Sequence, residues 1–204
     1  MNIGIIGAGR MAGALGARFA QAGHHLAVGA RNPEAAAALA RALGGGPAYG
    51  DIASAARFGE VILLAFNRSG ITEALAAAGD LRGKPLIDRN NLGPYPARGL
   101  SIADRIRGES GASVVKTFIR CHFHVWRMSP PAFDGRRLAV PYCGDDKVAK
   151  PRVRKLIAQM GCRPLDLGGL GKARHIEYLA AIVIALPFDG ADPSTVFNLV
   201  DTTT

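Results

Sequence analysis

The sequence has few cysteines, few aromatic residues and no apolar run long enough to cross a membrane. It has three cysteines, Cys121, Cys143 and Cys162, and no two of them have a C-x-x-C spacing. An odd number of cysteines without this spacing favours a reducing, cytoplasmic setting over a disulfide framework. The longest late apolar stretch, residues 178–188, is too short to span a bilayer and contains Pro187. The apolar start is interrupted by glycines, so we expect neither a signal peptide nor a membrane anchor.

Lysine-rich runs, alternating basic and aromatic residues and zinc-ligand spacings are also missing. The 204 residues nevertheless carry a net charge of +9, and the arginines are spread along the whole chain. This pattern argues against a nucleic-acid-binding protein, whereas a basic cleft for an anionic cofactor accounts for part of the charge. The apolar fraction of 49% is ample for a core, and the length fits one domain.

The most informative pattern lies at the start of the chain. A short apolar strand, Met1 to Ile6, runs into a G-x-G-x-x-A turn and then into a helix. Gly7 permits the tight turn, Gly9 lets the backbone approach a pyrophosphate, and Ala12 is small enough for the helix to pack on the strand. The pyrophosphate would lie at the positive end of the helix. We therefore predict a dinucleotide site at Gly7, Ala8, Gly9, Arg10, Met11 and Ala12.

The second strand indicates which dinucleotide is bound. NAD-binding chains usually carry an acidic residue at the end of this strand, where it binds the ribose 2′-hydroxyl. Here residues 24–29 are followed by Arg31 and Asn32, with no acid. The forked guanidinium of Arg31 suits a 2′-phosphate, and Asn32 can add a hydrogen bond. The pattern favours NADP(H), with an ordinary surface arginine as the alternative.

Strand and helix patterns alternate along the rest of the chain, which predicts an α/β fold. We expect a Rossmann-type, doubly wound, mainly parallel sheet in a single domain over residues 1–204. Residues 1–119 would form the dinucleotide-binding core, and residues 120–204 a small C-terminal α/β extension that shapes the acceptor crevice. Further strands are expected at residues 60–65, 84–88, 113–118, 137–143 and 163–167. Pro141 suggests that its strand is at an edge or bulged.

Several motifs together resemble one family. They are the segment 7–33, Asp88 and Asn91 as D-x-x-N, Lys116 and Phe118 as K-x-F, residues 143–146 as CGDD, and Gly161, Pro164, Asp166, Gly168, Leu170, Ala173, Arg174 and Glu177. On these residues the chain resembles the NADPH-dependent coenzyme F420 reductases, also called F420-dependent NADP oxidoreductases. The cytosolic reductase domain of some membrane ferric reductases is similar. The resemblance implies hydride transfer between NADPH and F420 or a flavin-like acceptor.

The expected nicotinamide end lies where the strands finish. We expect Ala65, Phe66 and Asn67 near the ribose and nicotinamide, and Asn91 in the same crevice. The chain departs from the family after three strands. Phe66-Asn67-Arg68 stands where the family usually has a proline after its strand, Leu92 where it has a proline, and Ile119 where it has an asparagine. These departures leave the identity of the acceptor open.

The segment around His122 and His124 offers the remaining candidates for chemistry. Hydride transfer between stacked rings needs proximity and orientation rather than a catalytic triad. Either histidine could nonetheless protonate a carbonyl or imine, and a metal site is not expected because no further ligand has suitable spacing. A loop that closes over the sheet edge is the structural alternative.

Two other functions fit the same residues. One is an NADPH-dependent reductase of a small imine or carbonyl, with His122 or His124 as proton donor. The other is a non-catalytic NADP(H)-binding protein. We also expect a homodimer, because a chain of this length leaves the acceptor crevice open. Lys116 could form a buried ion pair or bind a phosphate, and Arg174 and Glu177 are expected to pair within one helix.

Overall fold

The fold was analysed in a computed structural model of the chain. The structure describes residues 1–91, 93, 99–119, 121–133 and 135–186. The departure at Leu92 and the end of the apolar stretch at residues 187–188 lie outside this range.

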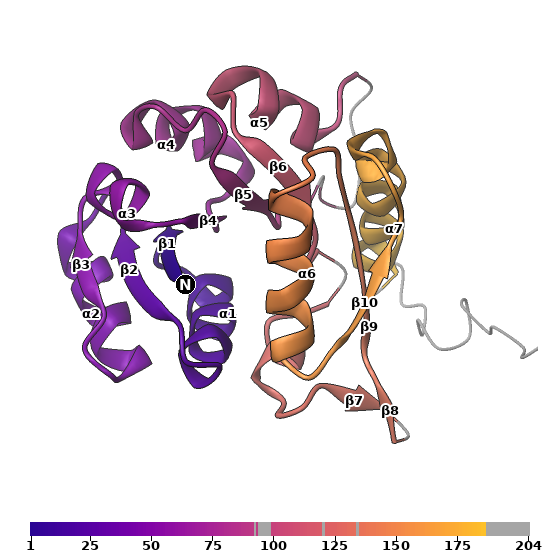
Figure 1. The fold of residues 1–204 in the computed structure, drawn as a ribbon, viewed down its shortest axis with the longest axis horizontal. Coiled ribbons are helices and arrows are strands. Elements are labelled where there is room, and N and C mark those ends of the chain that lie inside the picture. Colours follow the sequence, from indigo (N-terminus) through magenta and orange to yellow (C-terminus); the bar gives the residue numbers. More distant parts are fainter. Residues whose placement is uncertain (92, 94–98, 120, 134, 187–204) are drawn as a thin grey trace, which may run out of the picture.

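One sheet of eight strands runs through the molecule (Figure 1). From β3 to β6 the order is β3-β2-β1-β4-β5-β6, all parallel, and β9 then pairs antiparallel with β6 and parallel with β10. This order confirms the predicted Rossmann-type, mainly parallel α/β fold. The strands are β1 (Asn2–Ile6), β2 (His25–Gly29), β3 (Ala48–Gly50), β4 (Val61–Leu64), β5 (Pro85–Asp88), β6 (Ser113–Lys116), β9 (Ala139–Gly144) and β10 (Arg163–Asp166).

Helices cover both faces of the sheet. On one face lie α1 (Arg10–Gln21), α2 (Pro33–Leu43) and α6 (Ala149–Gln159); on the other lie α3 (Ile52–Phe58), α4 (Ile71–Ala78), α5 (Ile102–Ser110) and α7 (Ala173–Ala185). Short 3-10 helices occur at η1 (Arg68–Gly70), η2 (Val125–Arg127) and η3 (Leu170–Lys172), and a small hairpin at β7 (Ala132–Phe133) and β8 (Arg136–Arg137).

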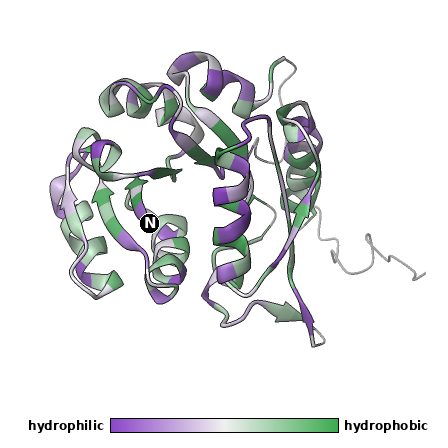
Figure 2. Ribbon diagram, viewed as in Figure 1, coloured by the Kyte–Doolittle hydropathy of each residue, from purple (hydrophilic) through white to green (hydrophobic). Residues whose placement is uncertain are grey.

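The sequence explains these elements locally. All four residues of β4 are fully buried and apolar, as expected for a parallel strand covered on both faces, and Figure 2 shows the central strands as mainly hydrophobic. Helix α2 begins at Pro33 because Asn32 caps it and proline suits the first helical position. The Asn32 side-chain oxygen accepts from the backbone N–H of Glu34 at 2.8 Å and of Ala35 at 3.2 Å.

The expectation that Pro141 marks an edge strand or a bulge was wrong, because β9 is an interior strand and its register with β10 is continuous from Ala139 to Tyr142. Its strand, β9, lies between β6 and β10. The pairing with β6 covers only Cys143 and Gly144, whereas Pro141 has its neighbour, Leu165, on the β10 side. The proline thus sits beyond the last β6 partner, where a missing N–H costs the sheet nothing.

The segment after β6 is anchored by aromatic packing. Trp126 and Phe118 are almost fully buried and meet edge to face with centroids 5.2 Å apart, and Phe118 meets Phe19 of α1 at 6.3 Å. Arg18 of α1 donates to the Ser129 hydroxyl and to the Met160 carbonyl oxygen, both at 2.7 Å. These contacts hold the segment on the same face of the sheet as α1.

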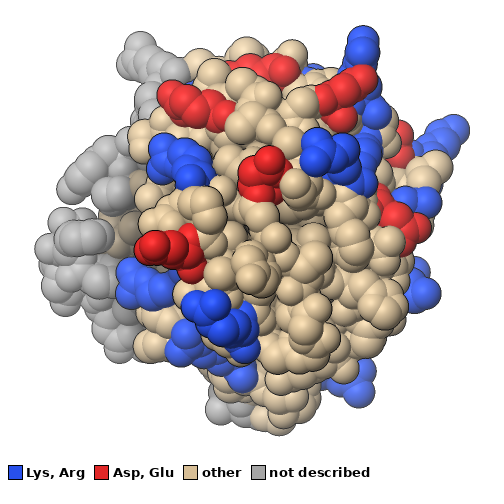
Figure 3. All heavy atoms as spheres, turned by 90° about the vertical axis from the view of Figure 1, so that its left-hand side faces the viewer, with Lys and Arg blue, Asp and Glu red and all other residues tan. Residues whose placement is uncertain are grey.

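Charges on the outer surface are mixed. Figure 3 views the molecule from the α2 side and shows basic and acidic side chains interspersed. On this face, the basic side chains do not form one continuous patch.

Two of the three thiols should be unreactive in the folded protein. Burial raises the pKa of Cys143 to about 12 and that of Cys162 to about 11. At pH 8, Ellman's reagent should therefore titrate at most one thiol per folded chain, and all three after unfolding in guanidinium chloride. Rapid reaction of two or more native thiols would contradict this packing. Because both folded pKa values exceed the ordinary 9.0, the unfolded chain loses these protons first, and stability should fall as pH rises above about 9.

Candidate functional site

The glycine turn lies between β1 and α1, and its two glycines serve different purposes. Gly7 has a φ of +117°, donates its N–H to the Gly29 carbonyl oxygen at 2.8 Å, and has no room for a Cβ, which would lie 2.5 Å from the Ala65 oxygen. Gly9 is exposed, and a Cβ there would meet nothing within 4 Å. Gly7 thus shapes the turn, whereas Gly9 leaves open space in front of the first amides of α1, a site suited to an anion.

A cleft of about 570 Å³ opens from this turn along the carboxyl ends of the strands. The turn contributes Gly9, Arg10 and Met11. The ends of β4, β5 and β6 and the segments that follow contribute Ala65, Asn67, Arg89, Asn91, Phe118, Ile119, Cys121, His122 and Phe123, and α7 contributes Val183 and Ile184. The volume is that of an ordinary small-molecule site, and its position is the usual ligand crevice of an open parallel sheet.

The predicted site residues do not all reach this cleft. It is lined by seven of them: Gly9, Arg10, Met11, Ala65, Asn67, Asn91 and His122. Ala8 lines a neighbouring groove between α1 and α2, and Ala12 lies on the buried face of α1, in the core. His124 is exposed, and its ring stands 4.8 Å from that of His122. Within the described part of the chain, no three His, Cys, Asp or Glu side chains form a group that could hold a metal ion.

Arg31 lies over the ring of Phe66. The guanidinium carbon is 5.2 Å from the ring centroid, and the ring itself is buried against Gly7 and Gly70. Phe66 therefore forms a support beneath Arg31 rather than part of the cleft lining. The guanidinium stays exposed at the end of β2, as a phosphate-binding group must.

A second stack closes the cleft beside the turn. The Phe123 ring is buried, with the guanidinium carbon of Arg10 4.8 Å from its centroid and that of Arg127 5.0 Å from it. Arg127 also lines the groove that contains Gly9 and Gly13. The segment that carries His122 thus brings a cation toward the amino end of α1, which adds to the positive potential there.

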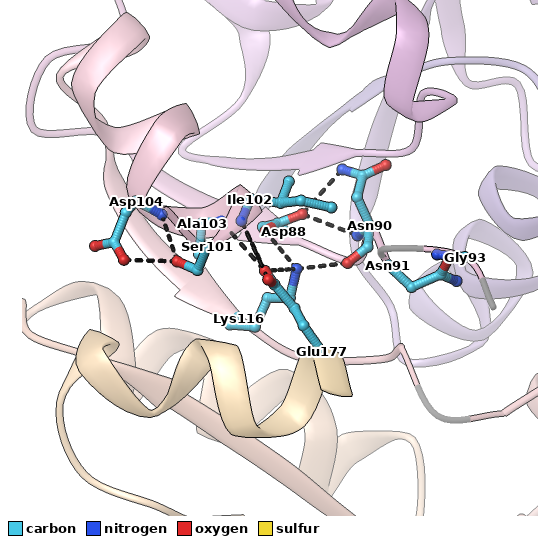
Figure 4. Close-up of polar contacts among 10 residues, drawn as sticks. All are labelled: Asp88, Asn90, Asn91, Gly93, Ser101, Ile102, Ala103, Asp104, Lys116 and Glu177. Carbon is cyan, nitrogen blue, oxygen red and sulfur yellow. Dashed lines mark hydrogen bonds and ion pairs between the residues drawn. The ribbon is translucent and has the colours of Figure 1, made fainter. Parts of the chain in front are cut away.

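A buried ion cluster lies behind the cleft (Figure 4). The Lys116 Nζ is 2.8 Å from Asp88 Oδ2 and 2.8 Å from Glu177 Oε1, and all three side chains are fully buried. The Lys116 ammonium also donates to the Asn90 carbonyl oxygen, and Asp88 Oδ1 accepts from the backbone N–H of Asn90 at 2.8 Å and from its side-chain amide at 2.9 Å. We refer to Lys116, Asp88 and Glu177 as the ion cluster.

The amino end of α5 balances the second carboxylate of this cluster. Glu177 accepts from the backbone N–H groups of Ile102 at 3.0 Å and of Ala103 at 3.4 Å. The expected pair of Arg174 with Glu177 was therefore wrong, since Arg174 Nε donates to the Tyr178 hydroxyl at 3.3 Å. Of the two alternatives for Lys116, the buried ion pair is the one that forms.

Sequence reasoning missed Arg89. This residue stands directly after β5, inside the D-x-x-N motif, and its side chain lines the cleft. Its Nη2 donates to the Phe66 carbonyl oxygen at 3.1 Å. Burial lowers the pKa of the Arg89 guanidinium, and the Asp88 charge offsets this only in part. The sequence offered one signal for this residue, namely a basic side chain directly after a buried strand.

The fold and the cleft define a dinucleotide-binding protein of the Rossmann type. Residues 2–91 match the model of the family described as NADP oxidoreductase, coenzyme F420-dependent. The chain belongs to this family of NADP-dependent oxidoreductases.

Individual relatives agree with this assignment. The chain is 33% identical to metalloreductase STEAP3 of Rattus norvegicus over 181 residues, which are 86% of this chain and 36% of that protein. It thus spans about a third of the length of the curated relatives it matches. A solved structure from Arthrobacter sp. FB24, described as an F420-dependent NADP-reductase, is 26% identical with a TM-score of 0.79, covering 94% of this chain and 96% of that one. A reductive aminase of Aspergillus terreus is 20% identical with a TM-score of 0.69 over 93% of this chain and 63% of its own, and shares the fold.

Among the residues that the structure describes, no helix has both the length and the apolar character needed to cross a bilayer.

Removing the cation from the ion cluster should strongly destabilise the fold. In Lys116→Met, two carboxylates remain buried with no cation between them, which should lower the free energy of unfolding by about 3–5 kcal/mol. Lys150→Met is a matched control, because the Lys150–Asp166 pair at 2.9 Å is partly exposed and should cost about 1 kcal/mol or less. Urea unfolding of both variants measures the difference. Equal losses in the two variants would mean that the cluster is not a main stabilising element.

Proposed function

We propose that this protein transfers a hydride from NADPH to a planar ring acceptor, a deazaflavin of the F420 type or a flavin. The observation that carries the proposal is the single cleft that joins the glycine turn to an apolar wall at the far end. One end suits a dinucleotide, and the other suits a second ring stacked on the nicotinamide.

The cofactor half of the proposal rests on two cationic positions. The pyrophosphate would bind the first amides of α1 beside Gly9 and Arg10, and the 2′-phosphate would bind Arg31 on its Phe66 support. Asn32 uses its side-chain oxygen to cap α2, so only its amide nitrogen is available to a phosphate. The ribose and nicotinamide would lie by Ala65, Asn67 and Asn91, which line the cleft, with Phe66 buried beside them.

The acceptor half rests on the apolar side chains at the other end of the cleft. Ile119, Val183 and Ile184 form a wall that can exclude water from two stacked rings. Hydride transfer needs the reacting atoms at about 3–3.5 Å, and orientation supplies most of the catalysis. This function asks for no nucleophile or metal, which fits the residues present.

The working unit would be one domain, with residues 1–119 holding the cofactor and residues 120–204 shaping the acceptor end. Tyr178 and Ile182 of α7 are apolar and partly exposed near this end. We therefore keep a homodimer as part of the proposal, to be tested by its mass in solution. A cytoplasmic location is proposed separately, from the cysteine pattern of the sequence.

A steady-state assay tests the acceptor. Purified protein is mixed with NADPH and oxidised F420, FMN, riboflavin, a ferric chelate or a cyclic imine, and oxidation of NADPH is followed together with bleaching of the acceptor. We expect fast bleaching of a deazaflavin or flavin with NADPH and much slower bleaching with NADH. The ferric chelate is included because the chain is similar to a metalloreductase, and the imine because His122, a possible proton donor, lines the cleft. Tight NADPH binding without turnover of any acceptor would favour a non-catalytic protein.

Arg31 should determine the choice between NADPH and NADH. Removing a charge-assisted contact with the 2′-phosphate is worth about 1.5–3 kcal/mol, so Arg31→Ala should weaken NADPH binding about 10-fold to 100-fold and leave NADH binding unchanged. Arg82→Ala is the matched control, because it also removes one exposed positive charge. Arg82 precedes β5 and so lies at the amino end of that strand, whereas Arg31 follows the carboxyl end of β2. Calorimetric titration measures the four dissociation constants. If both variants lost NADPH affinity equally, Arg31 would act only through the overall charge of the protein and not through contact with the 2′-phosphate.

A further inference from the structure

Arg89 places in the wall of the cleft a guanidinium that makes one hydrogen bond within the described part of the chain. It donates one hydrogen bond, from Nη2 to the Phe66 carbonyl oxygen, and its Nε is buried without a hydrogen-bond partner in the part of the chain that the structure describes. A guanidinium carries five N–H donors, and a buried donor without an acceptor is costly. The geometry therefore points to an acceptor that arrives with a ligand.

The neighbouring carboxylate does not supply this acceptor. Asp88 Oδ2 binds Lys116, and Oδ1 accepts two hydrogen bonds from Asn90. The Asp88 charge raises the pKa of Arg89 by less than burial lowers it, so the pKa stays below its ordinary value. Arg89 is thus adjacent to the ion cluster without being hydrogen-bonded to it.

Arg18 provides an internal comparison. It is also a buried arginine with an unpartnered Nε, but its other nitrogens donate to Gln21, Ser129 and Met160, all at 2.7 Å. Its role is to join α1 to the end of α6 and to the segment between η2 and β7. Arg89 makes a single such bond and lines the cleft, so its remaining N–H donors are available to a ligand.

The anionic groups of the cofactor are expected elsewhere. Under the proposed function, the phosphates lie at the start of α1 and at Arg31. Arg31 contacts the ring of Phe66, whereas Arg89 contacts its backbone oxygen, so Phe66 separates the two cations. The negative charge that Arg89 meets would then belong to the acceptor.

We propose that Arg89 binds the pyrimidine edge of the flavin or deazaflavin, at N1 and the C2 carbonyl oxygen, and stabilises the negative charge that forms there. This inference rests on the proposed function. The C4–H bond of NADPH breaks, and its electron pair forms a new bond to hydrogen at position 5 of the acceptor. NADPH becomes NADP⁺, the reduced ring holds the negative charge across N1, C2 and the oxygen, and a proton from water later neutralises it.

The test compares acceptors with and without a phosphate. Wild type, Arg89→Lys, Arg89→Ala and Arg18→Gln are assayed with riboflavin against FMN, and with the deazaflavin chromophore against complete F420. We expect Arg89→Ala to lose about 10-fold to 100-fold in kcat/KM with both members of a pair, mainly through kcat. Arg89→Lys should retain part of the activity, and guanidinium ion should partly rescue Arg89→Ala.

Controls separate this effect from a loss of structure. Arg18→Gln should lower Tm while keeping its acceptor kinetics, and guanidinium should not change them. The NADP⁺ dissociation constant of Arg89→Ala should stay within about twofold of wild type.

Three results would overturn the assignment. They are an unchanged kcat/KM in Arg89→Ala, a loss confined to the phosphate-bearing acceptors, and an equal weakening of NADP⁺ binding. If wild type reduces no acceptor, the proposed function fails separately. Arg89 is then judged by riboflavin fluorescence quenching in the presence of NADP⁺, where unchanged binding in Arg89→Ala overturns the role and weaker binding supports contact with the ring.

Discussion

The buried ion cluster of Lys116, Asp88 and Glu177 is the constraint on which the site depends. It joins the ends of β5 and β6 to α7, and through Glu177 it also reaches the amino end of α5. Burying three charges carries a large desolvation penalty, so the arrangement is stable only while every polar atom keeps its partner. The cluster therefore fixes where α7 and the β5 end stand, and with them Val183, Ile184 and Arg89 in the cleft.

Phe66 plays the corresponding role at the cofactor end. Its ring carries Arg31, and its carbonyl oxygen accepts from Arg89, so that one residue fixes the spacing of two cations. Phe66 thus connects the exposed guanidinium of Arg31 with the wall of the cleft at Arg89.

The segment that follows β6 connects the two ends. Trp126 anchors it in the core beside Phe118, and Phe123 holds Arg10 and Arg127 close to the glycine turn. Like charges so close together repel, and an anion bound nearby would relieve that repulsion. Part of the net charge of +9 is therefore concentrated where an anionic cofactor is expected.

The sequence by itself determined what depends on neighbouring residues. The glycine turn, the apolar strands, the cap at Asn32 and the mainly parallel fold follow from short-range patterns, because turn conformation and burial on two faces restrict residue types locally. Tertiary structure alone decided which distant side chains meet. The pairing of Lys116 with Glu177, the interior position of β9 around Pro141 and the approach of Arg89 to Phe66 depend on strand register and helix docking. No periodicity along the chain encodes these contacts, since their partners lie far apart in sequence.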